Sequence, residues 1–191
     1  MVLTTTLSFT WYSFAQVQWK TFNEKNAGLS MQIPSDWIPI MTPEEEKWTP
    51  IDVYAEHTTK NGSFASIEVF GSGSEYYDQK DSIADSLSEY ENETNYKLLN
   101  PIECGTYALN KLPACSFVVT YQDDGQPQTV LDVLAIDQKG IEYETEFVAS
   151  SDFYDRFFPA AEHMIKSISF DPDKVASVLN STSAGNTNLL I

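Results

Sequence analysis

The sequence predicts one domain of the α+β class, a sandwich in which helices cover a sheet. The chain has 191 residues, which is enough for one domain with a sizeable core. Several short segments alternate apolar and polar residues, and most of their connections are short enough for hairpins. Two longer segments carry apolar residues at helical spacing, so we expect two amphipathic helices to pack on that sheet.

The first half of the chain predicts four strands. They cover residues 19–22, 29–33, 51–55 and 64–70. Pro34 ends the second strand, and residues 41–50 are expected to form a loop with a proline on each side of an acidic run. The sequence KNGS between the last two strands is typical of a turn, which favours an antiparallel hairpin.

The second half predicts five more strand segments. They cover residues 96–99, 104–109, 114–121, 130–136 and 141–149. A turn at Asn110 and Lys111 places Cys104 and Cys115 nearly opposite one another on neighbouring strands, where a disulfide is feasible. A pair of free, buried thiols is the alternative. The sequence DQKG joins the last two strands in another hairpin.

The two helices are predicted at residues 81–91 and 152–168. The apolar face of the first consists of Ile83, Leu87 and Tyr90 at positions i, i+4 and i+7. The second also carries an apolar stripe, but Pro159 lies inside it. We therefore expect the second helix to kink or to start afresh at this proline.

The charge of the chain limits its partners. The sequence contains 28 acidic and 11 basic residues, which gives a formal net charge of −17. This charge repels phosphate backbones and anionic lipid, so we expect no nucleic-acid partner. It favours solubility, association with cations, or a basic protein partner. Aromatic residues make up 13% of the chain, so most of it is not expected to be disordered.

Residues 1–15 predict an export signal. They carry no charge, are mostly apolar or hydroxylated, and end in the small-x-small triplet Ser13-Phe14-Ala15. The stretch is too short for an ordinary membrane span, so no integral membrane segment is expected in the mature chain. A disordered or strand-forming N-terminus is the alternative. Residues 171–191 are predicted to be a polar tail, which leaves residues 16–170 as an extracytoplasmic domain.

Three motifs, in order, resemble the PsbP-like family. The first is GLSMQIPSDWIPI, with a glycine, an alternating strand and Pro-x-x-Trp; the second is LNKLPACSFVVTY; the third is KGIEYETEFVASSDFYDRFFPAAEHMIKSISF. The last motif is most similar to that of archaeal-type members. The resemblance covers about residues 19–170. It implies an α-β-α sandwich around a central, mostly antiparallel sheet.

The resemblance also bears on Trp37 and on function. It implies that Trp37 folds back over one end of the core in a packing role; an aromatic anchor for a ligand or partner is the alternative. Photosynthetic members of the family are extrinsic proteins of the oxygen-evolving complex, associated with calcium retention. The basic docking surfaces of plant-type members are not evident at a net charge of −17, so photosystem duty is not expected here.

Three groups of carboxylates are candidate ligands for Ca²⁺ or Mn²⁺. They are Glu142, Glu144 and Glu146 on one strand face, Asp123 and Asp124 in a turn, and Glu44–Glu46 in a loop. A solvated acidic surface is the alternative for each group. Because helices should not cover three adjacent glutamates, we expect the glutamate face to be open to water or to a partner.

The leading hypothesis is an exported, non-enzymatic accessory or binding protein with a protein partner at the cell surface. A calcium- or manganese-binding module is the first alternative. A secreted hydrolase with a dispersed site is the second. The enzyme hypothesis is weak because the sequence has no G-x-S-x-G motif and only two histidines, His57 and His163, to serve as bases.

Overall fold

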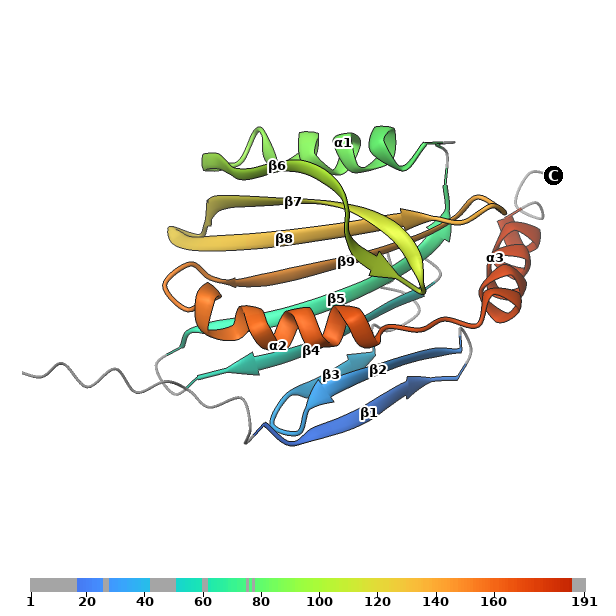
Figure 1. The fold of residues 1–191 in the computed structure, drawn as a ribbon, viewed down its shortest axis with the longest axis horizontal. Coiled ribbons are helices and arrows are strands. Elements are labelled where there is room, and N and C mark those ends of the chain that lie inside the picture. The colour runs from blue at the N-terminus through green and yellow to red at the C-terminus, as the bar shows by residue number, and fades with distance from the viewer. Residues whose placement is uncertain are drawn as a thin grey trace, which may run out of the picture.

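An antiparallel sheet of seven strands forms the centre of the structure (Figure 1). The computed structural model describes residues 17–25, 28–41, 51–59, 62–74, 76 and 78–186. The strands are β1 (Trp19–Glu24), β2 (Leu29–Pro34), β3 (Ile38–Met41), β4 (Ile51–Thr58), β5 (Phe64–Gly73), β6 (Thr94–Leu109), β7 (Leu112–Asp123), β8 (Gln126–Ile136) and β9 (Ile141–Ser150). The helices are α1 (Gln79–Tyr90), α2 (Tyr154–Ser167) and α3 (Pro172–Asn186). The predicted α+β class is therefore confirmed.

Strands from both halves of the chain lie in the same sheet. Their order runs β3-β4-β5-β9-β8-β7-β6, and each neighbouring pair is antiparallel. β5, from the first half, pairs with β9, the last strand. β1 and β2 form a separate two-stranded ribbon. Within the described residues, β3 and β6 are the edge strands of the large sheet.

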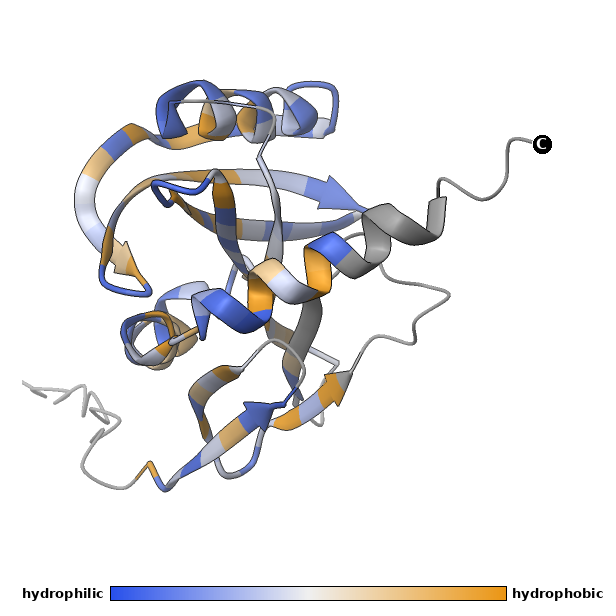
Figure 2. Ribbon diagram, turned by 90° about the vertical axis from the view of Figure 1, so that its right-hand side faces the viewer, coloured by the Kyte–Doolittle hydropathy of each residue, from blue (hydrophilic) through white to orange (hydrophobic). Residues whose placement is uncertain are grey.

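Both faces of the sheet are covered. α1 packs on one face over β6, β7 and β8, and α2 packs on the other face together with the β1–β2 ribbon (Figures 1 and 2). Side chains along β8 alternate between the two faces of the sheet. Val130 and Leu134 lie on the α1 side, whereas Leu131 and Val133 lie on the α2 side. The α-β-α sandwich that the family resemblance implied is therefore confirmed.

Trp37 packs into the core, as the family resemblance implied. Only 2% of the residue is exposed. Its ring centroid lies 6.2 Å from that of Phe157 on α2, edge to face, and 6.2 Å from that of His57 on β4. The turn after β2 thus carries the tryptophan back against α2.

α2 runs without a break through Pro159, where the sequence predicted a kink or a new start. Proline lacks the amide that would bond to the carbonyl of Asp155, so the helix loses one hydrogen bond. The helix nevertheless buries a full stripe of side chains, which are Phe157, Ala160, Ala161, Met164 and Ile165. Burial of this stripe outweighs one missing bond.

α3 occupies a stretch that the sequence predicted as a polar tail. The Oδ1 atom of Asp171 accepts a hydrogen bond from the amide of Asp173 at 3.2 Å, and Pro172 takes the first helical position. Val175 is fully buried in the core. Gly28 lies against this helix start, since a Cβ there would come within 2.5 Å of the Asp171 Cβ, and its φ of +64° also favours glycine. The packed structure therefore extends past residue 170.

The predicted disulfide between Cys104 and Cys115 is present. The two residues are direct cross-strand partners on β6 and β7. β6 is one long strand where the sequence predicted two short ones, and its pairing with β7 contains several register shifts. The disulfide therefore fastens an irregular edge strand to the sheet.

We expect removal of this disulfide to lower the free energy of unfolding by about 2–3 kcal/mol, because the bond closes a loop in the unfolded chain. The two cysteines are 11 residues apart. The measurement is urea unfolding of the wild type and of the Cys104→Ala/Cys115→Ala variant, each with and without reductant. Reductant should destabilise only the wild type; an equal response of both proteins would contradict the bond.

None of the described helices is long and apolar enough to cross a membrane. Two sequence predictions fall outside the described residues: the export segment at residues 1–15 and the acidic loop with Glu44–Glu46.

Candidate functional site

The three predicted glutamates of β9 lie under α1, so the prediction of an open glutamate face is wrong. Each accepts a hydrogen bond from a hydroxyl group of the helix. The bonds run from Ser82 to Glu142 (2.5 Å), from Ser86 to Glu144 (2.9 Å) and from Tyr90 to Glu146 (3.0 Å). A helix can cover these acids because it supplies a donor for each of them.

The match between helix and strand follows from their repeats. Hydroxyl groups at every fourth residue of α1 are separated by about 6 Å along the helix axis. Glutamates at every second residue of β9 are separated by about 6.6–6.8 Å along the strand. The two rows therefore stay in step over three contacts, and the glutamate side chains become partly buried.

Asp132 of β8 joins two of these glutamates, and the sequence analysis missed it. It is the direct cross-strand partner of Glu146, and it is fully buried. One carboxylate oxygen from each of Asp132, Glu144 and Glu146 lies within 4.8 Å of the other two. A signal was available, since this aspartate interrupts the apolar run Val130–Ala135 on a strand buried on both faces.

Burial and mutual repulsion make these carboxyl groups weak acids. Burial, followed by the charges of Glu144 and Glu146, raises the pKa of Asp132 well above its ordinary value. Burial and the charge of Glu146 raise the pKa of Glu144 to about 7, against an opposing effect of the Ser86 hydrogen bond. Burial also raises the pKa of Glu146, although the Tyr90 hydroxyl opposes the shift. The cluster thus resists carrying its full negative charge.

The structure does not bring Asp123 and Asp124 to this cluster. Both are exposed in the turn between β7 and β8. The Oδ2 atom of Asp123 accepts a hydrogen bond from the Gln128 side chain at 2.9 Å. Asp124 has a φ of +47°, a left-handed conformation typical of turns, and Gly125 follows it with a positive φ as well. These two aspartates therefore lie outside the set of converging carboxylates.

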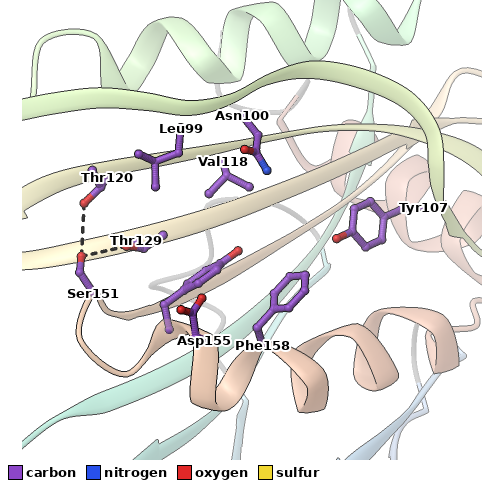
Figure 3. Close-up of a pocket in the computed structure, with 10 residues that line it drawn as sticks. Leu99, Asn100, Tyr107, Val118, Thr120, Thr129, Ser151, Asp155 and Phe158 are labelled. Atoms are coloured by element: carbon purple, nitrogen blue, oxygen red, sulfur yellow. Dashed lines mark hydrogen bonds between the residues drawn. The ribbon is translucent and has the colours of Figure 1, made fainter.

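A second candidate site is a groove of about 500 Å³ between the sheet and α2 (Figure 3). Leu99 and Asn100 of β6 border it on one side, and Asp155 and Phe158 of α2 border it on the other. The remaining lining residues are Tyr107, Val118, Thr120, Thr129, Ser151 and Tyr154. The groove therefore combines aromatic walls with several hydroxyl groups.

The hydroxyl groups lie together at one end of the groove. The Oγ atom of Ser151 is 2.8 Å from Thr129 Oγ1 and 3.2 Å from Thr120 Oγ1 (Figure 3). The Tyr154 hydroxyl is buried and has no hydrogen-bond partner within the described structure. Burial raises the pKa of Tyr154, so this hydroxyl stays protonated.

Neither histidine meets a nucleophile among the residues that the structure describes. The Nδ1 atom of His57 lies 3.5 Å from an oxygen of Asp36, beside a small hollow of about 170 Å³. No hydroxyl, thiol or lysine side chain is among the described residues that line this hollow. The Nε2 atom of His163 lies 2.6 Å from the side-chain oxygen of Gln32. A histidine–carboxylate pair is therefore present, and the part of the chain that the structure describes places no group beside it for it to activate.

Comparison with solved structures gives a fold. No protein-family model matches the chain, and no curated protein matches it. LpqN, involved in cell envelope biogenesis of Mycobacterium tuberculosis, is 14% identical with a TM-score of 0.59 over 84% of this chain and 98% of LpqN. The PsbP of the cyanobacterium Synechocystis is 10% identical with a TM-score of 0.54 over 85% of this chain and 98% of that protein. The fold is PsbP-like.

At these identities the PsbP-like fold is all that the likeness shows. The family resemblance found in the sequence is thus supported at the level of the fold. The closer similarity to archaeal-type members stays a prediction. Because one fold hosts many functions, function has to be argued from the two candidate sites.

Proposed function

We propose that the chain works outside the cytoplasm as a non-catalytic accessory protein that binds a protein partner in the groove between β6 and α2. The observation that carries the proposal is an exposed leucine, Leu99, in the lining of the groove. Leu98 is 42% exposed and Leu99 is 52% exposed. They lie at a register shift of β6, and Leu99 lines the groove itself. An exposed leucine in an aromatic-walled groove is typical of a binding surface.

The extracytoplasmic location rests on the disulfide and on the fold. Disulfides such as Cys104–Cys115 persist mainly in oxidising compartments. LpqN, with a similar fold, is involved in cell envelope biogenesis. The uncharged segment at residues 1–15 agrees with export.

We infer that an extended segment of the partner binds in the groove rather than along the edge of β6. The register shifts of β6 disturb the regular row of backbone groups that strand addition needs. Tyr107 also lines a second hollow of about 530 Å³, whose lining includes Lys111 and Lys166. A segment with an apolar side chain at Leu99 and an acidic group at these lysines would complement both hollows.

The hydrolase alternative has less support. His57 and Asp36 form the kind of pair that can activate a nucleophile, but the described lining of their hollow offers none. The carboxyl groups with raised pKa values lie under α1 rather than in the groove. We therefore propose binding rather than catalysis.

Photo-cross-linking in the native host tests the proposal. A photoreactive phenylalanine replaces Leu99, and a matched variant carries it at Gln138, an exposed residue in the β8–β9 turn. We expect the Leu99 variant to give one discrete cross-linked protein and the Gln138 variant to give none. Leu99→Asp should abolish association with that protein, with unfolding free energy unchanged within about 0.5 kcal/mol because the residue is largely exposed. No product at position 99, or the same products from both positions, would overturn the proposal.

A further inference from the structure

The buried carboxylate cluster has a geometry that needs a positive charge or a proton. Asp132 is fully buried, and neither of its side-chain oxygens has a hydrogen-bond donor among the described residues. Buried carboxylates almost always have donors or cations as partners. The groups that act most strongly on Asp132 are all acidic: Glu144, Glu146 and Glu142. Three ionised carboxylates at this spacing would repel one another strongly.

A proton offers one solution and a cation offers the other. The Asp132 and Glu144 carboxyl groups are close enough to share a hydrogen bond, but only if one of them is protonated. A cation between the three groups would neutralise them without protons. Since no lysine or arginine of the described residues pairs with the cluster, the cation has to come from solution.

We propose that Asp132, Glu144 and Glu146 form a binding site for one hard divalent cation, with Ca²⁺ the best fit. The converging oxygens all lie within 4.8 Å of one another, so one Ca²⁺ ion, whose oxygen ligands lie about 2.3–2.6 Å from it, can contact all three. Mg²⁺ usually keeps several water ligands and is held by one or two carboxylates, so a buried set of three carboxylates suits Ca²⁺ better. The ligands are all carboxylate oxygens, which suit Ca²⁺ or Mn²⁺ rather than Zn²⁺.

The surrounding hydrogen bonds prepare the site. The Ser86 hydroxyl donates to Oε1 of Glu144, and the Tyr90 hydroxyl donates to Oε1 of Glu146. These bonds fix both glutamates from the α1 side and leave further lone pairs for the ion. Asp132 approaches from the neighbouring strand as the cross-strand partner of Glu146. A bound ion would therefore fasten α1 to the sheet through two of its hydroxyl groups.

Calcium-dependent melting of the full chain tests the site. The protein is treated with a chelator and then melted at pH 7 with no metal, with Ca²⁺, with Mn²⁺ and with Mg²⁺. At a hundredfold excess over the dissociation constant, Ca²⁺ should raise the melting temperature by about 5–10 °C, because it binds only the folded state. Mg²⁺ should give a smaller rise. Equilibrium dialysis should find one Ca²⁺ per chain.

Three variants locate the site. Asp132→Asn and Glu144→Gln keep the shape of each side chain but remove a negative charge, so both should lose the Ca²⁺-dependent rise. Asp124→Asn, in the exposed turn, should keep it. Should Asp132→Asn fail to fold, Glu144→Gln and the dialysis stoichiometry still decide the question. No Ca²⁺-dependent rise in the wild type, or an equal rise in Glu144→Gln, would overturn the proposal and assign the cluster to a shared proton.

This site and the groove lie on opposite faces of the sheet, under α1 and α2 respectively. The cation experiment uses only the purified chain, whereas the cross-linking experiment reports only which protein contacts the groove. Failure of one proposal therefore leaves the other untouched.

Discussion

Trp37→Ala should lower the free energy of unfolding by about 3–5 kcal/mol, which is the usual cost of truncating a buried tryptophan. Domains of this kind are stable by only about 5–15 kcal/mol, so the variant would lose a large share of its stability. The side chain is 2% exposed and packs between His57 and the edge of Phe157. Its removal leaves a cavity where the turn after β2 meets α2.

The measurement is urea unfolding followed by far-ultraviolet circular dichroism, which does not depend on the missing indole. Ile38→Ala is the matched control, because Ile38 is the next residue and is 61% exposed. That variant should stay within about 0.5 kcal/mol of the wild type. Trp37→Phe should fall between the two. If Trp37→Ala unfolds at the wild-type midpoint, the packing role is wrong and an anchor for a ligand or partner becomes the better explanation.

The strands could be predicted because each obeys a local rule. Along β9, the residues Ile141, Tyr143 and Phe147 point to the core and the intervening glutamates point to the other face, as a period of two requires. The cysteine pair could be predicted only approximately: the turn at Asn110 brings the two strands together, but a register shift between Cys104 and Tyr107 sets the cysteines opposite one another. These features depend on residues that are close in the sequence.

The glutamates of β9 could be predicted as candidate ligands, but neither site could be predicted as a whole, because each joins distant segments. The glutamates of β9 are covered by hydroxyl groups 56–60 residues earlier in the chain. The serines and tyrosine at positions 82, 86 and 90 form a stripe at helical spacing, but nothing local says that this stripe faces acids. The groove draws on β6, β7, β8 and α2, and so depends on the order of strands in the sheet.

α3 was missed for a different reason. Its composition is polar, and only Val175 is fully buried among its described side chains. The Asp171-Pro172 start is a recognisable helix signal, but the low-complexity sequence that follows resembles a tail. A short apolar stripe, Val175, Ala176 and Leu179, packs on the core and holds this otherwise polar helix in place.

Without metal, the stability of the protein should fall as the pH rises from about 4.5 to about 7, the interval over which Glu144 holds a proton in the folded state only. Its pKa is raised to about 7, chiefly by burial, from an ordinary value of 4.5. In this interval the unfolded chain binds fewer protons, so each such group lowers the free energy of unfolding by about 1.4 kcal/mol per pH unit, or about 3 kcal/mol in all. Asp132, whose pKa is also raised, acts in the same direction.

Urea unfolding at several pH values, in the presence of a chelator, measures this slope. Glu144→Gln imitates the protonated carboxyl group and cannot lose a proton. Its free energy of unfolding should therefore decline less steeply with pH than that of the wild type, by about 1.4 kcal/mol per pH unit. Asp124→Asn should follow the wild type. Parallel curves for the wild type and Glu144→Gln would show that Glu144 is ionised throughout. Because a proton and Ca²⁺ would compete for the same oxygens, saturating Ca²⁺ should also flatten the wild-type decline. A smaller decline with Ca²⁺ present would show that cation binding stabilises the packing of α1 on the sheet.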